Sequence, residues 1–290
     1  MKQLSYWIQG LALRAMLWLV ALLPLDRRRA VVAWVTERTV RLTPLRRRIT
    51  RNLDHVWPDL PASARDRIVA GVGRNVGRSL TGIWFNADFA RDVADIRPEG
   101  PGWQVLQEAE AEGRGAIVVS GHFGQWEAIR HVMKRAGMEA GAIYRPNNNP
   151  YYEPIFRAGI DVGGQPIIPK GRAGYRVMIG HLRKGGFMAL LPDQRVSDGA
   201  VLPFLGRGAK TALAAAELAL RYDIPLVPAF APWEDGLRVV FEAPIPPSDP
   251  ETMMAEFNAR LGAWVERHPS QWHWLHRRWK MSARSRALES

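Results

Sequence analysis

Residues 118–131 read VVSGHFGQWEAIRH and join an apolar run to a segment with helical periodicity. Residues 117–119 are β-branched and run into Ser120-Gly121, a pair that favours a turn. His122 follows the turn, and Glu127 lies four intervening residues further on, inside the helical pattern. The stretch therefore predicts a buried strand that delivers His122 at its carboxyl end, followed by a helix.

The same alternation of strand and helix extends through most of the chain. Residues 30–90 are expected to be mostly helical. Further helices are expected at 102–112, 126–136, 151–159, 173–184 and 211–221, and strands at 116–119, 141–144, 187–191, 225–230 and 237–242. Strands that alternate with helices of about ten residues indicate an α/β fold, with a central, largely parallel or mixed sheet covered by helices.

Composition limits the possible chemistry. The chain has 290 residues, of which 47% are hydrophobic, enough for one large α/β domain with an appended element or for two small domains. It has no cysteine, which excludes disulfides, a thiolate nucleophile and cysteine-based metal sites. No cluster of His, Asp and Glu has ligand spacing, so neither a metal nor another cofactor is expected.

The net charge of +12 is concentrated at the two ends of the chain. Residues 1–60 hold 11 Lys/Arg against 4 Asp/Glu, and residues 267–290 hold 6 against 1, whereas the remainder is neutral. This distribution favours a polyanionic partner: an anionic lipid, a phosphorylated glycolipid, an acidic carrier protein or a nucleic acid.

The first apolar segment covers residues 4–29, LSYWIQGLALRAMLWLVALLPLDRRR. It could be a signal peptide, a transmembrane helix or an interfacial helix. Lys2 is the only early charge, which is atypical of a signal peptide, and Arg14 costs roughly 2.5–3.5 kcal/mol inside a bilayer. We expect residues 1–29 to form a retained membrane-anchoring helix, and residues 30–290 to form the functional domain. The alternative is a buried amphipathic helix of a soluble domain.

In a parallel sheet, ligands bind at the carboxyl ends of the strands, where His122 is expected. Glu127 would reach back to one ring nitrogen of His122 and leave the other nitrogen free as a general base. Ser120 is the only nearby hydroxyl, so a hydroxyl of the substrate is the expected nucleophile. The alternative is a histidine with a structural role in a turn.

The blocks HFGQWE (122–127), YRPNNNP (144–150), PDQ (192–194), residues 202–230 and HPSQWHWLHRRWK (268–280) occur in this order. Together with the N-terminal anchor and NLDHVWPDL, they resemble the lipid A late acyltransferases (lauroyl/myristoyl acyltransferases) from about residue 5 to about residue 281. These enzymes belong to the lysophospholipid acyltransferase-like group.

The resemblance implies transfer of a fatty acyl chain from acyl carrier protein to a hydroxyl of a membrane glycolipid, a lipid A precursor. It also implies location at the inner membrane, with the active domain facing the cytoplasm. His122 would be the general base, and Glu127 would orient it. Acyl-CoA as donor, and a phosphatidylinositol mannoside or lysophospholipid as acceptor, remain open.

Substrate-binding roles are expected for five residues near strand ends. Arg145 is suited to a phosphate or the phosphopantetheine of the donor, and Asp193 to the acceptor sugar or to Arg145. Gln194 is expected beside Asp193 at the edge of the substrate site. Lys170 and Arg172, like the cations at 207 and 210, are expected in phosphate-binding loops. Each also has a simpler interpretation, as a turn residue or a solvated charge. Backbone amides of residues 121–124 are candidate donors to the oxyanion of the thioester carbonyl.

The C-terminal QWHWLHRRWK (271–280) alternates aromatic and basic residues. This composition is typical of the headgroup layer of a membrane, and also of surfaces that stack single-stranded nucleic acid. No signature of a nucleic-acid-binding fold is present, and the apolar N-terminus has no use in such a protein. A membrane contact is therefore expected, and no nucleic-acid partner. A non-catalytic binding module stays the remote alternative.

Overall fold

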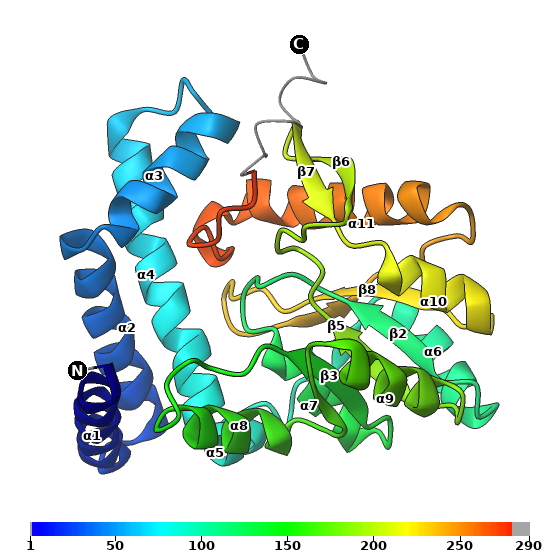
Figure 1. Cartoon of the computed structure of the whole chain (residues 1–290), viewed down its shortest axis with the longest axis horizontal. Coiled ribbons are helices and arrows are strands. Elements are labelled where there is room, and N and C mark those ends of the chain that lie inside the picture. Colours follow the sequence, from blue (N-terminus) through cyan, green and yellow to red (C-terminus); the bar gives the residue numbers. More distant parts are fainter. Residues whose placement is uncertain (1, 280–290) are drawn as a thin grey trace.

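A computed structural model describes residues 2–279 as a sheet covered by helices on both faces, with a layer of N-terminal helices at one side (Figure 1). Seven strands form the sheet in the order β1-β9-β8-β2-β5-β3-β4. Their bounds are β1 Pro98–Glu99, β2 Ala116–Val119, β3 Ala140–Tyr144, β4 Ile167–Pro169, β5 Phe187–Leu190, β8 Leu226–Phe230 and β9 Val239–Phe241. Only β8 and β9 pair antiparallel within it, which confirms the mixed, largely parallel sheet.

Strand β2 lies inside the sheet between β8 and β5 and is buried along its whole length. Ile117 and Val119 pack into the apolar cluster on one face, whereas Ala116 and Val118 pack into the cluster on the other. A strand covered on both faces needs apolar side chains at every position, which explains its unbroken hydrophobic run.

Helices cover both of these faces. One face carries α6 (Gly102–Ala111) and α7 (Glu127–Arg135), and the other carries α9 (Arg172–Leu182), α10 (Ala214–Tyr222) and α11 (Pro250–Arg267). The short helices α5 (Asn86–Asp92) and α8 (Glu153–Val162) pack beside α4 (Figure 1). The expected helices of this region exist, with ends shifted by a few residues.

The N-terminal layer consists of α1 (Lys2–Ala21), α2 (Leu25–Leu42), α3 (Leu45–Val56) and α4 (Ala62–Trp84). Helix α2 packs closely along α4 because two α4 glycines, Gly73 and Gly77, leave room for its backbone. Helix α1 buries only Gly10 and Val20. Among the described residues, α1 is the one helix long and apolar enough to cross a membrane, by length and composition alone.

An antiparallel hairpin formed by β6 (Ala200–Phe204) and β7 (Arg207–Thr211) lies outside the main sheet. Its two-residue turn, Leu205-Gly206, has positive φ at both positions, as a tight hairpin requires. The expectation of a loop with free cations at 207 and 210 is therefore wrong. Arg207 donates to the His55 carbonyl over 2.8 Å, and Lys210 donates to the Ser197 carbonyl over 2.8 Å.

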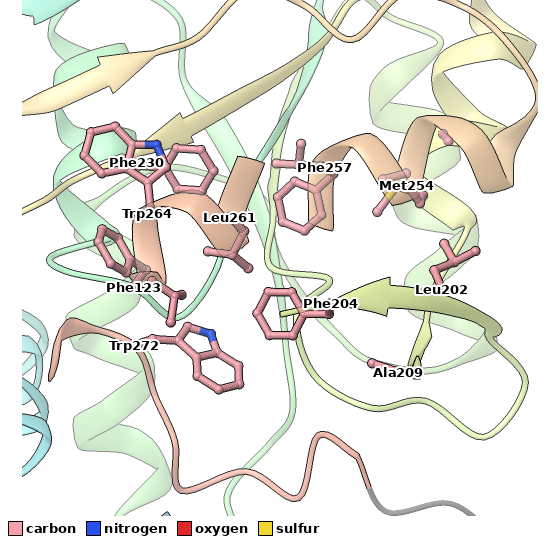
Figure 2. Packing of buried hydrophobic residues seen from close by; sticks show 14 of the residues in the cluster. Phe123, Leu202, Phe204, Ala209, Phe230, Met254, Phe257, Leu261, Trp264 and Trp272 are labelled. Atoms are coloured by element: carbon pink, nitrogen blue, oxygen red, sulfur yellow. The ribbon is translucent and has the colours of Figure 1, made fainter. Parts of the chain in front are cut away.

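The C-terminal aromatic block is part of the core. Trp272 and Trp274 are buried, and Trp272 packs edge-on against Phe204 between α11 and the hairpin (Figure 2). Trp279 is also buried, and Arg278 donates to the buried Thr211 hydroxyl over 2.7 Å. The expected membrane role is therefore wrong for these tryptophans, because composition alone does not distinguish an interfacial ring from a core ring. The remaining C-terminal basic residues, from Lys280 on, lie outside the described residues.

Candidate active site

Two neighbouring parallel strands bring His122 and Asp193 to the same edge of the sheet. Strands β2 and β5 pair in register as far as Val119 and Leu190, and His122 and Asp193 each follow three residues later. The Ser120 N–H donates to the Leu190 carbonyl over 2.9 Å and extends the pairing into the turn. The placement of His122 at a strand end is confirmed.

Asp193 holds His122 at two points. The Nδ1 atom of His122 lies 2.7 Å from Oδ1 of Asp193, and the His122 backbone N–H donates to Oδ2 over 2.8 Å. Trp272 donates its indole N–H to the same Oδ2 over 2.9 Å. Burial raises the pKa of Asp193, but the attraction of His122 and these hydrogen bonds outweigh it and keep the pKa below its ordinary value. Asp193 is therefore a buried carboxylate that stays ionised.

The second ring nitrogen of His122, Nε2, lies beside the side-chain amide of Gln194. With a proton on Nδ1 for Asp193, Nε2 is an acceptor, and the amide nitrogen of Gln194 lies 3.3 Å from it. The His122 side chain is 23% exposed, whereas Asp193 is 2% exposed. A hydroxyl that displaces the Gln194 amide would meet a basic nitrogen, as general-base catalysis requires.

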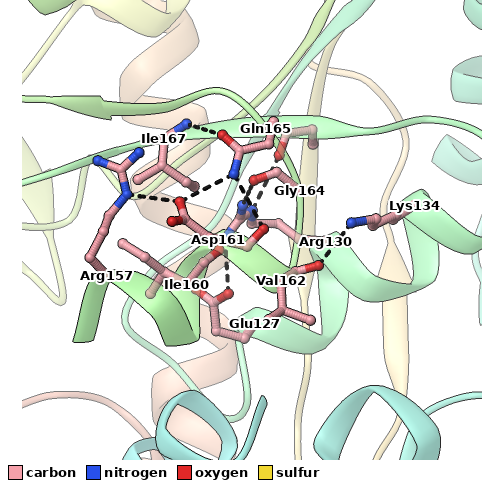
Figure 3. Close-up of polar contacts among 11 residues, drawn as sticks. Glu127, Arg130, Lys134, Arg157, Ile160, Asp161, Val162, Gly164, Gln165 and Ile167 are labelled. Carbon is pink, nitrogen blue, oxygen red and sulfur yellow. Dashed lines mark hydrogen bonds and ion pairs between the residues drawn. The ribbon is translucent and has the colours of Figure 1, made fainter. Parts of the chain in front are cut away.

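Glu127 lies at the start of α7 and is bonded to Arg130. Its Oε2 accepts a hydrogen bond from Nη1 of Arg130 over 3.0 Å, and Arg130 also donates to the carbonyls of Ala140 and Ile160 (Figure 3). The buried guanidinium needs a carboxylate, and Glu127 is three residues away on the same helix face. In this structure the carboxylate on Nδ1 of His122 is thus Asp193, and not Glu127 as the sequence spacing led us to expect.

The other predicted binding residues lie further along the same edge. Arg145 follows β3 and is exposed, with a long hydrogen bond of 3.4 Å to Asn148. Lys170 follows β4, and Arg172 begins α9; both are exposed, and no ion pair within residues 2–279 involves either. The three cations are solvated and lie beyond His122 in the strand order β2-β5-β3-β4. No bond joins Arg145 to Asp193.

Three of the four amides considered for the oxyanion already have acceptors. The backbone N–H groups of His122, Phe123 and Gly124 donate within the protein over 2.8, 2.7 and 3.0 Å. These three are therefore not free to stabilise an oxyanion. The side-chain amide of Gln194, beside Nε2 of His122, is a donor that we expected only as a substrate-binding group at the edge of the site.

The C-terminal segment completes the site, which sequence reasoning did not foresee. The His273 backbone N–H donates to the His122 carbonyl over 3.0 Å, and the two imidazole rings lie 5.9 Å apart. Burial lowers the pKa of His273 to about 4, so this neighbour is neutral at pH 7. His276 accepts from the Arg195 backbone N–H over 2.9 Å. In the sequence, the only sign of this arrangement is that the PDQ and QWHWLH blocks follow the HFGQWE block. The order of the blocks does not show that they contact one another.

No group of three or more His, Cys, Asp or Glu side chains that could hold a metal ion occurs in the described part of the chain. The arrangement is a histidine on a partly exposed side chain, with one ring nitrogen fixed by a buried, ionised carboxylate and the other beside a side-chain amide. It is suited to taking a proton from a substrate hydroxyl and returning it to a leaving group.

Several known proteins are similar to this chain over most of its length. The lauroyltransferase of lipid A biosynthesis from Escherichia coli K12 is 28% identical over 290 residues, with 95% of this chain and 92% of the relative covered. The palmitoleoyltransferase of the same strain is 27% identical, with 79% and 77% covered. A lipid A biosynthesis acyltransferase of Haemophilus influenzae is 22% identical, with 79% and 74% covered.

The family model described as bacterial lipid A biosynthesis acyltransferase matches residues 1–281, which is nearly the whole chain and includes every element of the site. The resemblance expected from the ordered blocks is thereby confirmed. The protein is an acyltransferase, and its chain belongs to the bacterial lipid A biosynthesis acyltransferase family.

Proposed function

We propose that this acyltransferase moves a fatty acyl chain from the thioester of acyl carrier protein to a hydroxyl of a lipid A precursor, with His122 as general base. The observation that carries the proposal is the pairing of Nδ1 of His122 with the buried Asp193, which leaves Nε2 of a partly exposed side chain as the acceptor. The positive ends of the chain support an acidic carrier and an anionic acceptor, mainly through faster encounter.

The proposed reaction needs no nucleophile from the protein. Nε2 of His122 takes the proton of the acceptor hydroxyl as its oxygen attacks the thioester carbonyl, and Asp193 stabilises the imidazolium that forms. The carbonyl oxygen becomes an oxyanion, for which the displaced amide of Gln194 is the proposed donor. Collapse of the intermediate forms the ester and breaks the carbon–sulfur bond, and His122 returns its proton to the departing thiolate.

Further roles follow from position. Arg145, Lys170 and Arg172, exposed along the same sheet edge, are proposed to bind phosphate groups of the acceptor or the donor. Glu127 is proposed as a positioning residue: through Arg130 it fixes α7 against the end of α8 and the turn after it. Helix α1 is proposed to anchor the enzyme in the inner membrane, with the α/β domain on the cytoplasmic side.

The test is acyl transfer to a lipid A precursor by purified full-length protein, followed by mass spectrometry. His122→Ala should lower kcat by about 10²–10⁴-fold, the usual contribution of a general base. Asp193→Asn should lower kcat comparably, because the amide cannot accept from all three donors, while KM changes little. Near-normal turnover of either variant would refute the mechanism. Acyl carrier protein and CoA thioesters are compared as donors, and preference for CoA would refute the proposed donor.

A Glu127 variant in the same assay distinguishes a positioning role of Glu127 from direct participation in the reaction. Glu127→Gln still accepts a hydrogen bond from Arg130, so it should retain far more activity than Asp193→Asn and keep the parental pH profile. A fully folded Glu127→Gln variant as inactive as His122→Ala would instead place Glu127 in direct contact with the reacting groups.

A further inference from the structure

Exposed apolar side chains are concentrated at one end of the molecule. Fifteen large hydrophobic residues are exposed in residues 2–279, and eleven of them lie between residues 4 and 42. The other four are scattered over α9, β6 and α10. Soluble proteins rarely gather exposed apolar groups in this way unless the surface meets a partner or a membrane.

Seven of the eleven belong to α1 and the turn after it, but four belong to α2. Val31, Trp34, Val35 and Leu42 follow one another at spacings of three, one and seven residues, and therefore form one stripe of the helix. Leu42 is 83% exposed and Trp34 is 59% exposed. The opposite face of α2 packs on α4, so this stripe, which we call the α2 outer face, is not a misplaced core surface.

Arginines border the α2 outer face. Arg27, Arg38 and Arg41 are exposed, and the guanidinium of Arg38 lies 5.7 Å from the centre of the Trp34 ring. Neither Arg27 nor Arg38 takes part in an ion pair with any residue from 2 to 279. Arg41 pairs with Glu37 over 3.3 Å. A stripe of Trp, Val and Leu edged by the unpaired cations Arg27 and Arg38 matches the apolar and anionic layers of a phospholipid surface.

The α2 outer face continues from α1 at a fixed geometry. Arg28 of α2 donates to the carbonyls of Leu23 and Ala21 over 2.6 and 2.8 Å, and its third bond, 2.6 Å long, is to Asp88. The joint between the two helices is therefore tied to the body of the protein. Figure 1 shows α1 foreshortened, whereas α2 runs along the plane of the picture, so the two helices lie at an angle to each other.

We propose that the α2 outer face is a second membrane contact, which lies in the headgroup layer of an anionic phospholipid bilayer while α1 enters the bilayer. The inference rests on the proposed membrane association and extends it from one helix to two. It explains why α2 carries both aromatic and cationic residues on the side away from α4. Two contacts at an angle fix the orientation of the domain, which a single helix would leave free to rotate.

The absence of cysteine allows a direct test by site-directed spin labelling. Val35→Cys and Leu42→Cys place a label on the α2 outer face of the full-length protein. Val177→Cys is the matched control, because Val177 is an exposed valine on α9, away from the N-terminal layer. Each labelled protein is reconstituted into vesicles of phosphatidylcholine with phosphatidylglycerol and into vesicles of phosphatidylcholine alone. Collision rates are measured with oxygen, which partitions into lipid, and with a water-soluble nickel chelate.

The expected result is a several-fold higher ratio of oxygen to nickel collisions at positions 35 and 42 than at position 177. Arg27→Gln combined with Arg38→Gln should reduce this ratio in the anionic vesicles. Equal ratios at all three positions would overturn the proposal. Dipolar broadening at position 35 that disappears on dilution with unlabelled protein would also overturn it, by placing a second copy of the chain on this face.

Acyl transfer measured on the same vesicles separates this proposal from the proposed function. Labels shielded at 35 and 42 in a protein without acyltransferase activity would refute the reaction and leave the membrane contact standing. Full activity with solvent-exposed labels would refute the membrane contact alone.

Discussion

Asp193 accepts three hydrogen bonds, from the ring and the backbone of His122 and from the indole of Trp272. Hydrogen bonds to a charged group each contribute about 1.5–3 kcal/mol, and leaving any of these donors unpaired in the interior is costly. An asparagine offers one acceptor oxygen and one amino group, so at least one donor would face another donor. The histidine would then change tautomer or move, which is why Asp193→Asn is expected to impair catalysis as severely as loss of the base itself.

The buried side chain of His131 makes the stability of the fold depend on pH. Burial, helped by the charges of Arg130 and Lys134, lowers the pKa of His131 from its ordinary 6.5 to about 4. Between these values the unfolded chain binds a proton that the folded protein does not. The free energy of unfolding is therefore at its full value above pH 6.5 and falls as the pH drops towards 4, by up to about 1.4 kcal/mol per pH unit for this group. His273, with its pKa also lowered to about 4, adds a similar slope.

Replacing His131 tests this dependence away from the catalytic histidine. His131→Leu removes the titrating group and a buried Nε2 that has no hydrogen-bond partner. Relative to the parent, the variant should gain about 2 kcal/mol in the free energy of unfolding between pH 7.5 and pH 5, measured by denaturant titration in detergent. A difference between the two proteins that stays constant with pH would contradict the assignment.

At the scale of elements, the contact between α2 and α4 depends on glycine. A Cβ on Gly77 would lie 2.6 Å from Cα of Ala33 and 2.3 Å from Oγ1 of Thr36, both on α2. Gly77→Ala should therefore push the helices apart and lower the free energy of unfolding by about 1–3 kcal/mol. Gly180→Ala, in α9, is the matched control because a Cβ there meets nothing within 4 Å. Gly180→Ala should leave the free energy of unfolding unchanged or raise it by up to about 1 kcal/mol. Thermal melts of both variants measure the two changes, and equal losses of stability would refute the packing argument.

Elements with strong local patterns could be predicted from the sequence, and those that depend on distant contacts could not. The apolar run of β2 and the turn before His122 are local, and both lie where expected. The hairpin was missed because Thr211 adjoins an alanine-rich helix and resembles its first residue. The partner of His122 was missed because spacing along one helix favoured Glu127, whereas pairing of β2 with β5 brings in Asp193 from 71 residues away.

At the scale of the whole molecule, membrane attachment should have an apolar and an electrostatic component. Helix α1 buries little of its surface in the protein, so deleting residues 2–21 should leave the domain folded. Intact protein should stay with membranes through a wash in high salt. The shortened protein should bind anionic membranes in low salt and be released by high salt, because ions screen the contribution of its arginines. Sedimentation after each wash measures how much of each protein stays with the membranes. Complete release of the intact protein by high salt would contradict anchoring by α1.

The contact of the C-terminal segment with His122 has a consequence for the order in which the protein acquires its properties. Helix α1 leaves the ribosome well before Trp272 and His273, the residues that brace Asp193 and His122. If α1 and His122 act as proposed, a nascent chain can thus reach the membrane before the pair of His122 and Asp193 is supported. An enzyme truncated before residue 272 would be delivered to the right place without the means to react there.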